Sequence, residues 1–175
     1  VQRTVDAFGA IDVVVNNAAT ALALPLGEFT LDAWNKSMDV NLRGPVFLVQ
    51  EALPWLKKSP HAAVLNVLTG AAFLFSSTIS LYAIGKAGMM AATRAMAAEF
   101  EPFGIRVNAL SPGTVDTDMV RKNTPEAQDV MTSIQLMKRK ASPDEMVGPA
   151  LMLTSDAGSF ITGHVVFADG GMVPH

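Results

Sequence analysis

Four short apolar runs predict buried strands, at residues 11–15, 63–67, 105–110 and 165–168. The first contains three consecutive valines, which is typical of a strand buried on both faces. Two longer patterns with helical periodicity, at about 31–56 and 80–100, lie between these runs. Thr30 and Asp32 suit the cap and the first turn of the earlier helix. Strands that alternate with helices at this spacing predict an α/β fold with a parallel sheet covered on both faces.

No linker and no internal repeat divides the chain, so we expect residues 1–175 to form a single domain. Ser142 followed by Pro143 predicts a further helix start. Within the second long helix, residues 87–98 carry a charge only at Arg94. A helix that is apolar all round is buried all round, and the sheet can cover only one side of it. We therefore expect a homo-oligomer, a dimer or tetramer, that covers the other side; the alternative is a cover made by the chain's own loops.

Composition argues against several classes of protein. Half of the 175 residues are apolar, and the net charge of −3 with scattered basic residues argues against a nucleic-acid partner. The absence of cysteine excludes disulfides, zinc–thiolate sites and cysteine nucleophiles, and it is compatible with the cytoplasmic location that we expect. Residues 62–85 are uncharged but carry too many polar side chains for a membrane span. The opening Val-Gln-Arg-Thr-Val-Asp does not have the pattern of a signal peptide.

Tyr82 and Lys86 are four residues apart, which places them one turn apart on one face of the predicted helix. A tyrosine with a pKa of about 10 exchanges protons poorly at neutral pH, and lowering that pKa by about three units takes roughly 4 kcal/mol. A lysine ammonium about 4 Å away supplies about that much at an effective dielectric constant of about 20. The pair can therefore act as a general acid/base. Taken alone, the spacing is explained more simply by a tyrosine in the core and a lysine in solvent.

Five further motifs occur in order along the chain. Asn16-Asn17-Ala18-Ala19 follows the triple-valine run, Asp39-Val40-Asn41-Leu42-Arg43-Gly44 lies on the first long helix, and Thr69 precedes Tyr82 by thirteen residues. Gly104-Ile105-Arg106-Val107-Asn108 leads into Ser111-Pro112-Gly113, and Asp169-Gly170-Gly171 follows the last strand. Together with Tyr82 and Lys86, these motifs resemble the short-chain dehydrogenases/reductases over essentially the whole chain from Phe8. The resemblance implies a doubly wound, Rossmann-like parallel sheet.

The same resemblance implies roles for individual residues. Tyr82 would be the catalytic acid/base, and Lys86 would lower the pKa of Tyr82 while hydrogen-bonding the nicotinamide ribose. Thr69 would bind the substrate oxygen, and Asn41 would hold a water of the proton relay. The segment from Pro112 to Met119 fits a PGxxxTxM pattern that holds the nicotinamide carboxamide, although a Pro-Gly pair alone is an ordinary turn. The residues expected to bind the cofactor are Asn16, Ala18, Tyr82, Lys86, Pro112, Gly113, Val115 and Thr117.

Two features depart from the family pattern. Thr69 stands where the family has a serine, and its extra methyl restricts χ1 and could place the hydroxyl differently. The glycine-rich TGxxxGxG turn, which brings backbone N–H groups to the cofactor pyrophosphate, does not occur in this chain. We therefore expect an N-terminally incomplete fold, missing the first strands of the nucleotide-binding half.

The implied function is an oxidoreductase that uses NAD or NADP to interconvert an alcohol and a ketone of a small-molecule substrate. One alternative is a truncated, non-catalytic relative that retains only the subunit-association surface. Another is a lyase or epimerase on the same scaffold, which would keep Tyr82 and Lys86.

Other candidate sites fail more simply. The three histidines at 61, 164 and 175 lack metal-ligand spacing, and no GxSxG motif supports a serine hydrolase. We expect Asp116 and Asp118 to hydrogen-bond within their loop rather than bind a metal, and residues 138–140 to form a solvated turn. The serines at 76, 77 and 80 are expected in a loop and a helix entry. The run Phe73-Leu74-Phe75 is either core or an apolar wall of the substrate pocket.

Overall fold

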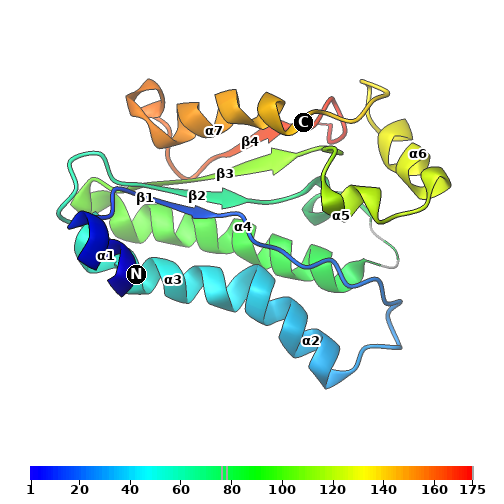
Figure 1. The fold of residues 1–175 in the computed structure, drawn as a ribbon, viewed down its shortest axis with the longest axis horizontal. Coiled ribbons are helices and arrows are strands. Elements are labelled where there is room, and N and C mark those ends of the chain that lie inside the picture. Colours follow the sequence, from blue (N-terminus) through cyan, green and yellow to red (C-terminus); the bar gives the residue numbers. More distant parts are fainter. Residues whose placement is uncertain (76, 78, 175) are drawn as a thin grey trace.

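The structure is a computed structural model that describes residues 1–75, 77 and 79–174. A parallel four-stranded sheet lies at its centre, in the order β1 (Val13–Asn16), β2 (Ala63–Val67), β3 (Arg106–Pro112) and β4 (Val165–Ala168). Helices α3 (Gly44–Leu56) and α4 (Ser80–Phe100) cover one face, and α7 (Val147–Thr154) covers the other (Figure 1). These three layers confirm the predicted α/β fold and its parallel sheet.

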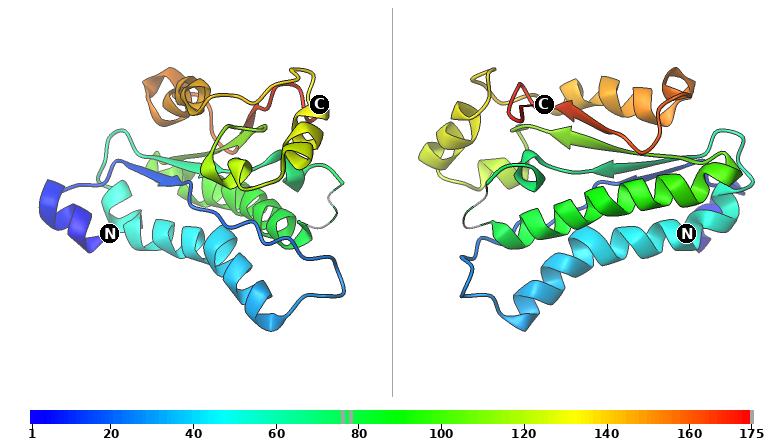
Figure 2. Two further views of the ribbon diagram at one scale, coloured as in Figure 1. Left: turned by 45° about the vertical axis from the view of Figure 1, so that its right-hand side comes forward. Right: turned by 180° about the vertical axis from the view of Figure 1, so that it is seen from behind.

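Shorter helices complete the described chain. The α-helices are α1 (Gln2–Phe8), α2 (Leu31–Met38), α5 (Asp118–Arg121) and α6 (Pro125–Ser133). A π turn spans Asp39–Arg43, and 3-10 turns span Gly70–Ala72, Glu101–Phe103, Pro143–Met146 and Asp156–Gly158. α4 runs along the sheet beside α3 (Figure 2), with α4 against β3 and β2 and α3 against β1. Among the described residues, no helix is long and apolar enough to cross a membrane.

Two apolar cores lie on opposite faces of the sheet, because successive residues of a strand point to opposite sides. Val64 of β2 belongs to the larger core, which includes Val49 of α3 and Met89 of α4. Leu65, the next residue of β2, packs with Leu153 of α7 in the smaller core. The sheet is therefore held from both sides, as the alternating sequence pattern predicts.

The first strand is less buried than its three valines predict. Val13 and Val15 are 39% and 49% exposed, while Val14 between them is buried. β1 is an edge strand that pairs only with β2, and α7 packs over β2 and β3 rather than over this edge. The prediction of burial on both faces is wrong for β1, because the face that carries Val13 and Val15 is open.

The predicted helix at 31–56 is divided by the π turn at Asp39–Arg43. Pro45 has no N–H to donate to the carbonyl four residues earlier, which is that of Asn41. The N–H of Gly44 instead reaches back five residues to the Asp39 carbonyl. A Cβ on Gly44 would lie 2.8 Å from that oxygen, so the glycine permits this close return. The Gly44-Pro45 pair thus accounts for a break that the hydrophobic pattern does not reveal.

Other helix predictions are confirmed. The Oγ1 of Thr30 accepts a hydrogen bond from the Ala33 N–H at 3.1 Å, and α4 spans the predicted residues 80–100. Ser142 and Glu145 form a reciprocal capping box at the entry to α7. The outer side of α4 is exposed at Ala91, Arg94, Ala95 and Ala98, so the described loops do not cover it. Association through this side stays a prediction.

Candidate functional site

The carboxyl ends of the four parallel strands meet at one edge of the sheet, which is where ligands bind in open α/β sheets. Asn16 ends β1, Thr69 follows β2, and Pro112 ends β3 immediately before Gly113. The N-terminal turns of α4 bring Tyr82 and Lys86 to the end of β2. The fold therefore brings several predicted site residues to a common edge.

Lys86 is anchored at the end of β2. Its Nζ donates a hydrogen bond to the Val67 carbonyl at 2.6 Å, and the residue is only 3% exposed. Burial lowers the pKa of Lys86 from 10.5 to about 8, because the charged ammonium is desolvated. The side chain is therefore mostly protonated at neutral pH but titrates within reach of it. The simpler explanation of the spacing, in which the lysine lies in solvent, therefore does not hold.

Tyr82 lies one turn before Lys86, and its ring centroid is 5.8 Å from the Lys86 Nζ. Burial raises the pKa of Tyr82 above 10.0, and a hydrogen bond with the side chain of Thr69 partly opposes that rise. The expectation that Lys86 lowers the pKa of Tyr82 is not met in this structure, because desolvation of the phenol outweighs the other contributions. Tyr82 is consequently a neutral phenol at neutral pH, with a proton to give.

Thr69 connects β2 to the short turn at Gly70–Ala72. Its Oγ1 accepts a hydrogen bond from the Ala71 N–H at 3.3 Å, which fixes the start of that turn. The same side chain hydrogen-bonds Tyr82. The threonine hydroxyl is thus next to the phenol, where the resemblance expects the family's serine.

Asn41 lies in the π turn and is fully buried, and its side chain holds the chain after β1. Its Oδ1 accepts from the Thr20 N–H at 3.0 Å, while its Nδ2 donates to the Thr20 carbonyl at 2.8 Å and to the Ser37 Oγ at 3.2 Å. The side-chain amide therefore has a structural role. The backbone carbonyl of Asn41 has no α-helical donor, because Pro45 lacks an N–H.

Two glycines on α4 allow the π turn to pack closely against this helix. A Cβ on Gly85 would lie 2.9 Å from the Cβ of Asn41, and a Cβ on Gly88 would lie 2.9 Å from the Leu42 Cδ2. Neither glycine stands out in the hydrophobic pattern, although glycine within a helix is a signal because it destabilises the helix by about 1 kcal/mol relative to alanine. Gly85 thus sets the distance between Asn41 and the helix that carries Lys86.

The end of β1 is tied to β2 by a buried side-chain hydrogen bond. The Nδ2 of Asn16 donates to the Oδ1 of Asn66 at 2.8 Å, and both residues are buried. Ala18, two residues beyond β1, is exposed. Asn66 was not among the residues selected from the sequence, because its role depends on partners from β1 and α4.

After β3, the chain makes a close turn at Gly113. The Gly113 N–H donates to the Ala168 carbonyl at 3.1 Å, and a Cβ on this glycine would lie 2.6 Å from the Asp169 carbonyl oxygen. Val115 is buried and bridges to Ala141. Thr117 is the N-cap residue before α5, and its side chain makes no capping hydrogen bond.

The remaining candidates of the sequence analysis are explained by local contacts. Lys140 pairs with Asp116 at 3.2 Å, and Arg121 pairs with Asp118 at 2.7 Å. No group of acidic and histidine side chains in the described part of the chain could hold a metal ion. Arg139 makes a two-point ion pair with Glu145, so residues 138–140 are paired rather than simply solvated.

The aromatic run at residues 73–75 lies partly in the core, and Ser80 lies at the predicted helix entry. Phe73 packs against the larger core and lies 4.8 Å from Phe167 between ring centroids, whereas Phe75 is fully exposed. The core interpretation therefore holds for the first residue of the run. Ser80 begins α4 as expected. Ser76 and His175 lie outside the described residues.

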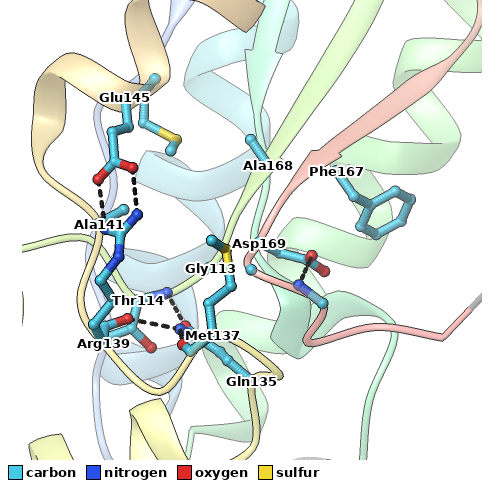
Figure 3. A pocket seen from close by; sticks show the side chains of 13 residues that line it. Gly113, Thr114, Gln135, Met137, Arg139, Ala141, Glu145, Phe167, Ala168 and Asp169 are labelled. Atoms are coloured by element: carbon cyan, nitrogen blue, oxygen red, sulfur yellow. Dashed lines mark hydrogen bonds and ion pairs between the residues drawn. The ribbon is translucent and has the colours of Figure 1, made fainter.

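A cavity of about 290 Å³ lies beside the Gly113 turn, between η4 at Pro143–Met146 and the chain after β4 (Figure 3). Gln135 lines it, accepting from the Thr114 N–H at 2.6 Å and donating to the Met137 and Arg139 carbonyls. None of Asn41, Thr69, Tyr82 and Lys86 lines this cavity. It is therefore separate from the tyrosine–lysine group.

Comparison with known proteins gives consistent matches over nearly the whole chain. A family model described as "Enoyl-(Acyl carrier protein) reductase" matches residues 1–173. The 3-oxoacyl-[acyl-carrier-protein] reductase FabG of Thermotoga maritima is 32% identical over 173 residues, which cover 99% of this chain and 70% of that protein.

Two solved structures match equally broadly. A putative short-chain alcohol dehydrogenase from Sinorhizobium meliloti 1021 has a TM-score of 0.91 at 29% identity, covering 98% of this chain and 69% of its own. A blue fluorescent protein from a metagenomic library, solved in complex with NADPH, has a TM-score of 0.91 at 28% identity. The match covers 99% of this chain and 69% of that protein.

Proposed function

The chain belongs to the short-chain dehydrogenase/reductase family of NAD(P)-dependent oxidoreductases, and on this premise we propose that it carries the catalytic residues for interconverting an alcohol and a ketone. The observation that carries the proposal is the group at the end of β2. Lys86 is held by the Val67 carbonyl, Tyr82 lies one helical turn away, and Thr69 hydrogen-bonds Tyr82.

The polar groups at this edge suit a nicotinamide dinucleotide. An ammonium has three N–H donors, and the described structure gives Lys86 one partner, the Val67 carbonyl. A ribose diol offers acceptors for the other donors of this nearly buried group. Among the described residues, the buried Ser111 Oγ just before the Pro112-Gly113 turn also has no hydrogen-bond partner. Buried polar atoms normally have one, so both observations support a polar ligand at this edge.

We assign the cofactor contacts to this chain's residues by their position. Lys86 and Tyr82 would bind the nicotinamide ribose, and the turn of Pro112 and Gly113 with Val115 and Thr117 would hold the nicotinamide. Asn16 and Ala18 would contact the adenosine side. The cofactor, when bound, supplies hydride to a carbonyl carbon or accepts it from an alcohol.

The proton chemistry is assigned to side chains of the same group. In the reductive direction, the Thr69 hydroxyl orients the substrate oxygen by a hydrogen bond, and the neutral phenol of Tyr82 gives its proton to that oxygen. The raised pKa of Tyr82 keeps the phenol protonated beforehand. The Lys86 ammonium, placed one turn away, stabilises the phenolate that results. The Asn41 carbonyl would hold the water that returns a proton from solvent.

We also propose that residues 1–175 form one catalytic domain that lacks the first strands of the nucleotide-binding half. The chain spans about 70% of the length of the relative FabG, and no TGxxxGxG turn occurs in it. The open face of β1 at Val13 and Val15 supports an apolar neighbour there. Assays of activity should therefore use the complete gene product, with the 175-residue chain beside it.

The test of the function is a cofactor-linked assay with defined probes. The substrate class of FabG makes acetoacetyl-coenzyme A with NADPH or NADH the first probe, and simple secondary alcohols with NADP⁺ or NAD⁺ test the reverse direction. We expect absorbance of the reduced nicotinamide to change in step with substrate. Conversion of substrate without cofactor turnover would indicate a lyase or epimerase, and inactivity over a broad panel of ketones and alcohols would favour the non-catalytic alternative.

A further inference from the structure

A chain of buried side-chain hydrogen bonds connects β1, β2 and α4. The Nδ2 of Asn16 donates to the Oδ1 of Asn66 at 2.8 Å, and the Nδ2 of Asn66 donates to the Oγ1 of Thr93 at 2.9 Å. The Thr93 hydroxyl then donates to the Met89 carbonyl at 2.8 Å, one turn back on α4. Asn66 and Thr93 are fully buried, and Asn16 is 7% exposed.

These side-chain hydrogen bonds give α4 a second attachment to β2. Lys86 bonds the carbonyl of Val67, and Thr93 bonds the side chain of the preceding residue, Asn66. Thr93 follows Lys86 by seven residues, which is two helical turns or about 10 Å along the axis. Two directional contacts at this separation fix both the position of α4 along β2 and its rotation about its own axis.

The other contacts between α4 and the sheet do not have this property. Met89, Met96, Ala97 and Phe100 pack into the larger core through apolar atoms. Close packing also resists movement of α4, but apolar burial is non-directional and does not select one hydrogen-bonding register. A small slide of α4 would move Lys86 away from the Val67 carbonyl and Tyr82 away from Thr69.

We propose that Asn66 and Thr93 are positioning residues that hold α4 in the register in which Tyr82 meets Thr69 and Lys86 meets Val67. Through Asn16, the same link makes the position of α4 depend on the end of β1. The catalytic consequence rests on the proposed function, whereas the placement of Tyr82 does not and can be measured separately.

The contrasting explanation is that Asn66 and Thr93 only stabilise the fold, as any satisfied buried polar group does. Asn108 of β3 provides a matched control for that role. It is also fully buried, its Nδ2 donates to the Ile161 carbonyl at 2.7 Å, and its Oδ1 accepts from the His164 N–H at 3.1 Å. Neither partner of Asn108 belongs to α4. Asn108→Ala therefore removes comparable buried hydrogen bonds without touching the proposed link.

The experiment compares Thr93→Val, which keeps the side-chain shape but removes the hydroxyl, with Thr93→Ser, which keeps the hydroxyl. 3-Fluorotyrosine incorporated site-specifically at position 82 of the complete gene product gives one fluorine NMR signal. We expect Thr93→Val to shift that signal at neutral pH, and Thr93→Ser and Asn108→Ala to leave it unchanged. In the complete gene product, Thr93→Val should lower kcat by about tenfold or more with little change in KM, because a misplaced group affects chemistry more than binding.

The two measurements separate the proposal from the function on which it rests. If Thr93→Val is destabilised as Asn108→Ala is but keeps the wild-type fluorine signal, the positioning role is wrong and the proposed function stands. If the fluorine signal shifts in Thr93→Val alone but the wild-type protein converts no substrate, the positioning role stands and the proposed function fails. Should Thr93→Val not fold, the fluorine signal and kcat of Thr93→Ala are compared with those of the same controls.

Discussion

Replacing Lys86 by methionine tests the electrostatics of the site without any substrate. The Lys86 ammonium is 3% exposed, and its pKa is lowered from 10.5 to about 8 by burial. This depression is worth about 3 kcal/mol at 1.36 kcal/mol per pKa unit. Below pH 8 the folded protein carries the whole of this unfavourable contribution.

The sign of the pH dependence follows from proton binding. Between the folded pKa of about 8 and the unfolded pKa of 10.5, the unfolded chain holds more protons at Lys86, so this group makes the protein more stable as the pH rises. From pH 7 to about 9.5, the gain is about 2 kcal/mol. Tyr82 acts in the opposite direction only as the pH rises through 10 and above, because its folded pKa is raised.

The assay is urea unfolding of wild type and Lys86→Met at pH 7 and at about pH 9.5. Methionine removes the buried charge but also leaves the Val67 carbonyl without its donor, which opposes the gain by about 1–3 kcal/mol at both pH values. The pH-dependent part remains: the stability of Lys86→Met relative to wild type should fall by about 2 kcal/mol between the two conditions. Lys122→Met, at an exposed position, controls for the loss of one lysine. An equal difference at both pH values would show that burial does not lower the pKa of Lys86.

Three further predictions concern the substrate side, the helix contact and the open sheet edge. Thr69→Val should lower kcat by roughly 10²-fold, as loss of an oxyanion donor does, while Thr69→Ser should retain or raise it. Steady-state rates of the complete protein measure both effects, and equal rates for valine and threonine would show that another group polarises the substrate. Gly85→Ala places a Cβ 2.9 Å from the Asn41 Cβ, so it should lower both kcat and stability, by about 1–3 kcal/mol in urea unfolding; unchanged values would mean that the contact does not set the position of α4. The 175-residue chain alone should bind nicotinamide dinucleotide weakly or not at all, and it should self-associate because Val13 and Val15 are exposed on an edge strand. Calorimetry measures the binding and light scattering measures the association. A monodisperse monomer with micromolar affinity for the dinucleotide would contradict this prediction.

The sequence predicts the sheet well because strand and helix periods are local properties. The four apolar runs became β1 to β4 within about two residues at each end, and α4 was predicted at its observed bounds. The spacing of Tyr82 and Lys86 likewise places them one turn apart on any helix. These features need no knowledge of what the elements pack against.

Features that depend on distant partners were not predictable in the same way. The link from Asn66 to Thr93 joins residues 27 apart, and it forms only once α4 lies against β2. The π turn reflects the Gly44-Pro45 pair together with the close packing of Asn41 on Gly85. The pKa of Tyr82 depends on how far its whole surroundings exclude water, so a distance between two residues could not decide its direction.

The central claim is that Tyr82 transfers the proton in a nicotinamide-dependent oxidation or reduction, and Tyr82→Phe in the complete gene product tests it most directly. Phenylalanine removes the hydroxyl and keeps the ring, so the fold should change little, and the cofactor should lose only the one ribose contact that Tyr82 supplies. We expect kcat for the best probe substrate to fall by roughly 10² to 10⁴, the range of general acid/base catalysis. Turnover equal to wild type in a correctly folded Tyr82→Phe protein would contradict it.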